Sequence, residues 1–387
     1  MGKVIYLDNS ATTPVSEEVL HEMTPYFSEL YYNPSARYGK SRSVKVAIEH
    51  AREQVADLIN ANPSEIYFTS GGTESDNWAL DIAMSPEIRG RIVVSEIEHP
   101  AVFNKAIEVE KDGFLSVIAP VDRQGFVDLA EIKKIGEVSQ ELGSDIGFAS
   151  IMLANNEIGT IQPIRAIADY VHSCGGYMHT DAVQAVGNMP VDVKELDVDL
   201  LSMSSHKLCG PKGVGALYIE RTVPTRPLLF GGGQEYGMRS GTENVPGIVG
   251  FGKACELAKK NIKKHVKRMV ALRAELFFRL IDSIQGTHLI GPGNISERLP
   301  GNLAVAFDGV EAESLLMALD NFDVCCSVGS ACSSNKLTPP RVLEAIGVPD
   351  ELIHGVVRFS LGAANTEDDV EQAATRIKEC VNILRAI

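Results

Sequence analysis

The feature that most constrains this chain is the alternation of short apolar segments with helical stretches. The apolar segments occupy residues 66–70, 91–96, 148–154, 176–181, 199–204 and 215–219. Stretches with helical periodicity lie between them, for example IRAIADYVHSC at 164–174. Strands that alternate with helices need crossover connections, so we expect an α/β fold with a largely parallel sheet.

The alternation of short apolar segments with helical stretches ends after Gly241. A long helical stretch over about residues 245–284 is followed by apolar segments at 302–307 and 356–361 and by further helical segments. A chain of 387 residues is long for one core. We predict a large α/β domain over residues 16–260, and a smaller α+β domain made of residues 1–15 and 261–387.

Composition excludes several function classes. The net charge of −15 argues against nucleic-acid binding, which depends on basic surface. No apolar run approaches the roughly 18 residues that cross a bilayer, and the start of the chain has no secretory pattern. We therefore expect a cytoplasmic protein without a membrane or nucleic-acid partner.

The seven cysteines are scattered and odd in number. They lack the paired Cys-x-x-Cys spacing of a zinc site and do not form the pattern of a disulfide framework. At least one free thiol is expected.

A cluster of polar residues follows each of five apolar segments: TSGGTES, EIEHP, ANNEIG, HTDAVQ and SSHK. Ligands in parallel sheets bind at the carboxyl ends of the strands. We expect these five clusters to line one pocket.

One cluster suits a phosphate group. In SGGTESDN, two glycines free the backbone and Thr73 opens a helix whose unpaired N–H groups face an anion. The alternative is a plain Ser/Thr helix cap. YGKS at 38–41 and GGGQEYG at 231–237 each miss a glycine required by the common phosphate motifs.

Two further residues have chemistry to offer. Asp181 ends an apolar strand and can bond a protonated ring nitrogen; with His179 it could also ligate a metal, although no third ligand is near. Lys207 lies between two apolar segments, where burial would favour a Schiff base, unless it simply reaches water from a loop. A phosphate-binding loop, an acid such as Asp181 and a lysine such as Lys207 are together the parts that a pyridoxal phosphate site requires.

The ordered motifs of the whole chain resemble a known family. They are YLDNSATTPV, NPSARYG, TSGGTESDN, EHPAV, NNEIGTIQPI, HTDAVQAVG, SSHKLCGPKGVGALY, GGGQEYGMRSGTENV and SACSS. In this order they resemble the cysteine desulfurases of the NifS/IscS type, group I, in the class V aminotransferase superfamily. The resemblance implies a type I pyridoxal phosphate fold, with a mainly parallel seven-stranded sheet in the large domain.

The resemblance also implies roles for residues around the cofactor ring. Lys207 would form the Schiff base, and Asp181 would pair with the pyridinium nitrogen. Gln184 and Asn156 would bond the phenolic edge of the ring. His99 would stack on the ring and transfer protons.

Other matched residues would bind the phosphate. Gly72, Thr73, Ser204 and His206 match the phosphate positions within one chain. Thr242 matches a residue that reaches the phosphate of the second subunit, which implies a homodimer with shared sites.

The resemblance also implies which residues bind the substrate and attack its sulfur. Arg358 matches the arginine that binds the substrate carboxylate, and Cys332 in GSACSS matches the nucleophile. L-cysteine would be converted to L-alanine, leaving a persulfide on Cys332 that passes its sulfur to an acceptor. The resemblance implies an iron–sulfur scaffold protein as that acceptor, and possibly a tRNA-thiolating enzyme; no metal is implied at the site.

Two other readings remain open. One is another enzyme of the same fold, an aminotransferase or a selenocysteine lyase; transamination needs no loop thiol such as Cys332. The other is a non-catalytic sulfur carrier that retains the fold, against which an intact Lys207 argues. The chain also departs from the family pattern at Cys209, where a tyrosine is common, and at Gly72, where alanine is usual. Cys325 and Cys326 could relay sulfur, but we expect them to be buried strand cysteines.

Overall fold

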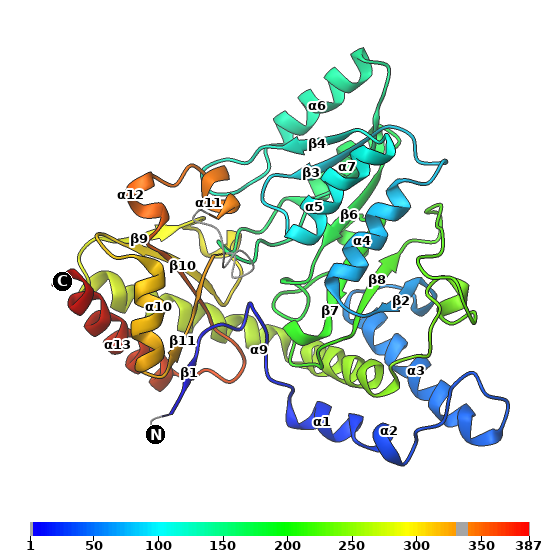
Figure 1. Cartoon of the computed structure of the whole chain (residues 1–387), viewed down its shortest axis with the longest axis horizontal. Helices are drawn as coiled ribbons and strands as arrows, with labels where there is room; N and C mark the ends of the chain where they lie inside the picture. The colour runs from blue at the N-terminus through cyan, green and yellow to red at the C-terminus, as the bar shows by residue number, and fades with distance from the viewer. Residues whose placement is uncertain (1–2, 330–339, 387) are drawn as a thin grey trace.

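A seven-stranded sheet forms the centre of the larger part of the molecule (Figure 1). The computed structural model describes residues 3–329 and 340–386. In spatial order the strands are β2 (Ile66–Thr69), β8 (Gly215–Ile219), β7 (Leu200–Ser204), β6 (Tyr177–Asp181), β5 (Ile146–Ser150), β3 (Arg91–Ser95) and β4 (Ser116–Ala119). Only β8 is antiparallel to its neighbours, so the sheet is mainly parallel, as predicted.

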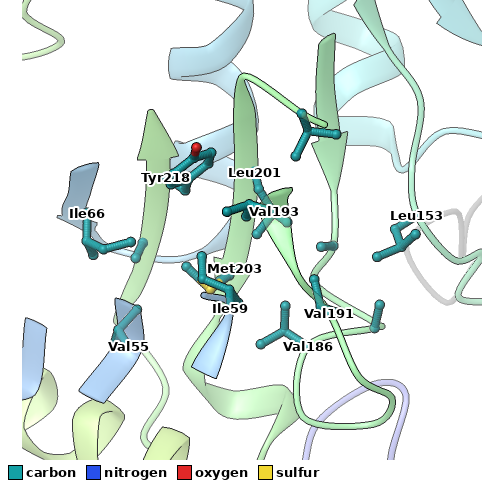
Figure 2. Packing of buried hydrophobic residues seen from close by; sticks show 14 of the residues in the cluster. Val55, Ile59, Ile66, Leu153, Val186, Val191, Val193, Leu201, Met203 and Tyr218 are labelled. Carbon is teal, nitrogen blue, oxygen red and sulfur yellow. The ribbon is translucent and has the colours of Figure 1, made fainter. Parts of the chain in front are cut away.

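Helices cover both faces of this sheet. The helices of this part are α1 (Glu17–Met23), α2 (Pro25–Ser28), α3 (Gly39–Leu58), α4 (Gly72–Ala83), α5 (Pro100–Glu108), α6 (Leu129–Glu141), α7 (Ile164–Ser173) and α8 (Val193–Leu196). Val55 of α3 packs in one apolar cluster with Leu201, Met203 and Tyr218 of the sheet (Figure 2). Trp78 of α4 belongs to a second cluster on strands β3, β5, β7 and β8. Strands β5 and β7 are buried along their whole length, because helices cover both faces of the sheet there.

A four-stranded antiparallel sheet lies in the C-terminal third. Its order is β12 (Ser327–Val328), β13 (Val356–Ser360), β10 (Asn302–Phe307) and β9 (Thr287–Ile290). The helices of this third are α10 (Ala312–Asn321), α11 (Arg341–Ala345), α12 (Asp350–Ile353) and α13 (Glu367–Arg385). β1 (Ile5–Tyr6) pairs in parallel with β11 (Val324–Cys325), so the start of the chain packs on this third.

The helix α9 (Val245–Ser283) connects the two parts (Figure 1). Its first turns, up to Cys255, are buried against the cluster of the seven-stranded sheet. From Met269 onward its apolar side chains belong to the C-terminal cluster, with Leu303 and Phe359. No residue of α9 between these two segments is buried.

Helix α9 does not have the membrane-spanning character that its length might suggest. No helix among residues 3–329 and 340–386 is both long and apolar enough to cross a membrane.

Candidate active site

The polar clusters predicted at the strand ends do lie at one edge of the seven-stranded sheet. Strands β2, β3, β5, β6 and β7 run in the same direction, so their carboxyl ends meet there. The first turn of α4 follows β2, His99 follows β3, and Asn156 follows β5. Asp181 ends β6, and Lys207 lies in the single 3₁₀ turn Ser205–Lys207 after β7.

A cavity of about 410 Å³ opens at the N-terminus of α4. Its lining includes all four residues predicted to bind phosphate: Gly72, Thr73, Ser204 and His206. Gly71 caps the helix without a side-chain hydrogen bond, so its first N–H groups are available to a ligand. Lys212 adds a positive charge to the lining. The donors and charge of this cavity fit a phosphate group.

An acidic residue in the same lining is neutralised by its partner. Glu74 accepts hydrogen bonds from Arg239 Nε at 2.8 Å and Nη2 at 3.1 Å. Its burial acts to raise the pKa of the carboxyl, but the hydrogen bonds from Arg239 and Ser70 outweigh this and lower it. The ion pair therefore limits the repulsion that Glu74 would exert on an anion.

The glycine at position 72 has a local reason. A Cβ on Gly72 would lie 2.6 Å from Cγ2 of Val183, in the loop after β6. Such a contact is too short for any real Cβ, so an alanine here requires Val183 to move. Glycine at position 72, where the family usually has alanine, thus allows α4 to pack closely on Val183 in the loop after β6.

Asp181 is almost fully buried at the carboxyl end of β6. Its Oδ1 accepts a hydrogen bond from the backbone N–H of Val183 at 2.9 Å. Burial raises the pKa of the carboxyl, and the nearby His99 and Lys207 act in the opposite direction. A buried carboxylate in this position is suited to pair with a cation such as a protonated ring nitrogen.

His99 is the N-cap of α5, where its Nδ1 accepts from the backbone N–H of Ala101 at 3.2 Å. The neutral ring therefore carries its proton on Nε2. Burial lowers the pKa of His99, with Lys207 acting in the same direction and Asp181 against it. A neutral imidazole with a defined tautomer can accept or donate a proton during catalysis.

Lys207 reaches the backbone near the start of the chain. Its Nζ donates to the carbonyl oxygen of Ser10 at 2.5 Å and to that of Ala11 at 2.8 Å. Gln184 Nε2 donates to the same Ser10 oxygen at 3.0 Å. Lys207 and Gln184 both line a second cavity, of about 290 Å³, that also includes Asn9 and Ser360. Lys207 is half-buried and lies against residues 10 and 11 of the N-terminal arm.

Arg358 lies on β13 and has a side chain only 6% exposed. Its Nη1 donates to the backbone oxygen of Asn156 at 2.9 Å, and its Nη2 to Asp8 Oδ1 at 2.8 Å. Arg358 thereby joins the C-terminal sheet to the edge where the other predicted site residues lie. Asn156 contributes its backbone to this contact.

Two predicted residues are not placed with the others. Thr242 is exposed and lines a separate cavity of about 70 Å³ beside Glu235 and Arg239. Cys332 lies outside the described residues.

The other cysteines of the C-terminal third are poorly ionised. Cys325 ends β11 and is partly exposed, while Cys326 is buried directly after it. Burial raises the pKa of Cys325, and it raises the pKa of Cys326 to about 12. A thiol must ionise to act as a nucleophile, so these two are weak candidates at neutral pH.

The metal alternative pairs His179 with Asp181. His179 lies beneath the edge, with its Nδ1 2.8 Å from Ser150 Oγ and its Nε2 3.0 Å from Ser202 Oγ. Within residues 3–329 and 340–386, no group of three His, Cys, Asp or Glu side chains is arranged to hold a metal ion.

The sequence analysis missed four acidic residues near the site: Asp8, Asp76, Glu98 and Glu157. Asp76, Glu98 and Glu157 are buried, and each has one carboxylate oxygen without a hydrogen-bond partner in the described part of the chain. Burial is the main cause that raises the pKa of all three. Glu98 and Glu157 belong to the strand-end clusters EIEHP and ANNEIG, which is the signal that could have identified them.

Comparisons with known proteins agree with this geometry. Residues 5–373 match the family model described as aminotransferase class-V. The chain is 48% identical to a cysteine desulfurase IscS of Methanosarcina thermophila, over 99% of this chain and 93% of that protein. It is 46% identical to the cysteine desulfurase IscS of Dictyoglomus turgidum, over 100% and 97%.

Solved structures give the same result. A NifS-like protein superposes with a TM-score of 0.90 and 39% identity, covering 98% of this chain and all of that one. The structure described as SspA in complex with cysteine superposes with a TM-score of 0.78 and 32% identity, covering 92% and 98%. The chain therefore belongs to the class V aminotransferase family and, within it, to the cysteine desulfurases of the NifS/IscS type.

Proposed function

We propose that this protein removes sulfur from L-cysteine with the help of pyridoxal 5'-phosphate, forming L-alanine and a persulfide on Cys332. The observation that carries the proposal is the meeting of Asp181, His99 and Lys207 at a sheet edge beside a cavity with donors for phosphate. When bound, pyridoxal phosphate supplies an electron sink for the substrate carbon next to the amine. The family is pyridoxal phosphate-dependent, and the fit of these residues supports the same cofactor here.

The cofactor phosphate would lie in the cavity at the N-terminus of α4. Gly72 and Thr73 would offer backbone N–H groups, and Ser204 and His206 would complete the cradle. Burial, with Lys207 and Lys212 in support, lowers the pKa of His206 to about 4. His206 is therefore neutral at pH 7 before phosphate binds, and it would offer a ring N–H to the phosphate as a hydrogen-bond donor.

The ring of the cofactor would lie between Asp181 and His99. Asp181 would hold a proton on the ring nitrogen, and the positive charge there would return this buried carboxyl to its ionised form. His99 would hold or move a proton at Nε2. Lys207 would anchor the cofactor covalently, and Gln184 and Asn156 would bond its phenolic edge.

The reaction balances without an external oxidant. The thiolate of Cys332 attacks the substrate sulfur, the carbon–sulfur bond breaks, and a sulfur–sulfur bond forms. A proton passes to the β-carbon, which gives L-alanine. Arg358 would bind the substrate carboxylate; the SspA relative, solved in complex with cysteine, is consistent with such a substrate.

We also propose a homodimer. Thr242 is exposed and lines a cavity beside the one at the N-terminus of α4, and this exposure supports the role at the phosphate of a second subunit that the family resemblance implies. Size-exclusion chromatography with light scattering measures the mass, and Thr242→Ala is expected to weaken cofactor retention. A monomeric protein that retains full activity would contradict this part of the proposal.

The persulfide is proposed to serve an acceptor in the cytoplasm, such as an iron–sulfur scaffold protein. A reducing compartment keeps the nucleophilic thiol available. The division into residues 16–260 for cofactor binding, and 1–15 with 261–387 for the sulfur-carrying part, is likewise proposed. The separate apolar clusters around the two sheets support it.

Incubation of the cofactor-loaded protein with L-cysteine tests the proposed function directly. L-alanine and protein-bound persulfide should form in equal amounts in the first turnover, and Cys332→Ser is the matched control that should form neither. Formation of a keto acid with the amine left on the cofactor would instead identify an aminotransferase. Selective turnover of selenocysteine would identify a selenocysteine lyase.

A further inference from the structure

Asp8 is the partner of the arginine that the proposed function assigns to the substrate carboxylate. The ion pair between Asp8 Oδ1 and Arg358 Nη2 spans 2.8 Å, and the two side chains are 20% and 6% exposed. Arg358 Nη1 is bound by the backbone oxygen of Asn156. Arg358 Nε is buried and has no hydrogen-bond partner among the described residues.

These contacts fix the orientation of the guanidinium. Its planar group has five N–H donors, and a carboxylate binds best to two parallel donors along one edge. Each terminal nitrogen of Arg358 already donates to an acceptor. Rotation of the group is therefore restrained, and each terminal nitrogen keeps a second N–H that these two bonds do not use.

Asp8 is itself held firmly beside Arg358. It forms a β-bridge with Ser360, two residues beyond Arg358 on β13. Asn9 donates to the Ser360 oxygen through its backbone N–H at 3.1 Å and its Nδ2 at 2.8 Å. The backbone N–H of Ser10 donates to Ser360 Oγ at 2.8 Å. Asp8 is thus held against β13, the strand to which Arg358 belongs.

The same arm reaches the other end of the site. Ser10 and Ala11 offer their carbonyl oxygens to Lys207. Residues 8–11 consequently connect the lysine that would anchor the cofactor with the arginine that would bind the substrate carboxylate. Asp8 contacts the arginine, whereas the lysine donates to backbone oxygens of Ser10 and Ala11. Replacement of the Asp8 side chain should therefore affect the affinity for substrate and leave the cofactor bound.

We propose that Asp8 is a positioning residue for substrate recognition: its hydrogen bond to Nη2 orients Arg358 so that the remaining N–H groups of the terminal nitrogens meet the substrate carboxylate. This inference rests on the proposed function of Arg358. A purely structural ion pair would instead affect stability without distinguishing substrates that have a carboxylate from amines that lack one.

The test compares Asp8→Ala and Asp8→Asn in the cofactor-loaded enzyme. Loss of the charge-assisted hydrogen bond in Asp8→Ala should raise the KM for L-cysteine about tenfold and change kcat much less. Asp8→Asn should restore the KM, because its amide oxygen still accepts from Nη2. Lys3→Met is the matched control, since it breaks the other ion pair of the arm, Lys3 with Asp369 at 2.5 Å.

Cysteamine, which has the amine and thiol of cysteine but no carboxylate, is the second probe. Its binding, followed by the change in the visible spectrum of the cofactor, should be the same in Asp8→Ala, the control and the parent. Equal weakening of cysteamine and L-cysteine would overturn the positioning role, as would an unchanged KM in Asp8→Ala or an Asp8→Asn variant as poor as Asp8→Ala. Asp8→Leu repeats the test without an acceptor if Asp8→Ala does not fold.

Arg358→Lys separates this inference from the proposed function. An unchanged KM for L-cysteine in Arg358→Lys would refute the assignment of Arg358 itself. A raised KM there, with normal recognition in Asp8→Ala, would refute only the role of Asp8.

Discussion

Replacement of Glu98 by glutamine is expected to change how the stability of this protein depends on pH. Glu98 is 1% exposed; its Oε1 accepts from Ser95 Oγ at 2.5 Å and from the backbone N–H of Met152 at 2.8 Å. Burial raises the pKa of the carboxyl to about 8, against the effect of these two hydrogen bonds. The native state therefore keeps Glu98 protonated at pH 7.

The direction of the pH effect follows from the unfolded chain, where the pKa of a glutamate is 4.5. Between pH 4.5 and about 8 the native state holds a proton that the unfolded state has released. The contribution of Glu98 to stability is complete below pH 4.5 and is lost as the pH rises toward 8. At about 1.4 kcal/mol for each pH unit, this interval sets an upper bound of about 5 kcal/mol.

Glutamine has nearly the same shape and no proton to lose. Its Oε1 can accept the same two hydrogen bonds, so Glu98→Gln should unfold with nearly the parental free energy at about pH 5. At about pH 9 the variant should be the more stable protein, by several kcal/mol. Urea unfolding of both proteins across this range measures the difference.

The control is Glu96→Gln, which removes a less buried carboxylate two residues away. The buried His179 has no charge interaction with Glu98, so its effect cancels in the comparison. Asp76 and Asp181 do interact with Glu98, so their titration contributes to the measured difference. If the difference in unfolding free energy between Glu98→Gln and the parent did not change with pH, a neutral Glu98 in the native state would be refuted.

Four further variants test the proposed chemistry. Lys207→Ala should fold but lack the visible absorbance of a lysine-bound cofactor; a reducible cofactor–protein imine in this variant would identify a different anchor. Asp181→Asn should keep the cofactor and lose activity by about two or more decades, since a neutral partner cannot hold the ring nitrogen protonated; near-normal turnover would remove Asp181 from the mechanism. Cys332→Ser should bind L-cysteine yet form no persulfide, whereas joint replacement of Cys325 and Cys326 by alanine should leave the first turnover nearly intact. Mass spectrometry of the cysteine-treated protein locates the added sulfur, and sulfur that appears first on Cys325 or Cys326 would reverse this assignment.

The sequence was most informative where strands are completely buried. GALYI is apolar along its length, and the strand part of DLLSMS adds only two serines to apolar residues, because both faces of β7 and β8 are covered; both segments were predicted. The edge strands β4 and β9 were missed, since partial exposure leaves SVIA and THLI without a clear pattern.

A local break was missed as well. The apolar pattern of SEEVLHEMTPYFSEL, residues 16–30, is helical throughout, but the structure has α1 and α2 with Thr24 between them. Pro25 has no N–H to donate to the preceding turn, and it serves instead as the first residue of α2. The apolar pattern carried no information about this interruption.

For the candidate site, too, some features were predicted from the sequence and others were not. The strand-end clusters that contain His99, Asp181 and Lys207 were predicted from order along the chain, because parallel strands bring their carboxyl ends together. The pairing of Asp8 with Arg358 was not predicted, because 350 positions separate the two residues. Such a contact depends on how the N-terminal arm packs on β13, and no local pattern encodes it.

The helix α9 places a constraint on the length of the chain. Its middle, residues 256–268, contains no fully buried residue and separates a segment packed at the seven-stranded sheet from one packed on the C-terminal cluster. One inserted or deleted residue there would rotate the two segments relative to each other by about 100°. Met269, Leu272 and Leu276 would then turn away from their partners, and Arg358 would lose its alignment with Lys207. The number of residues in this middle segment is therefore fixed by helical phase, whatever their identity.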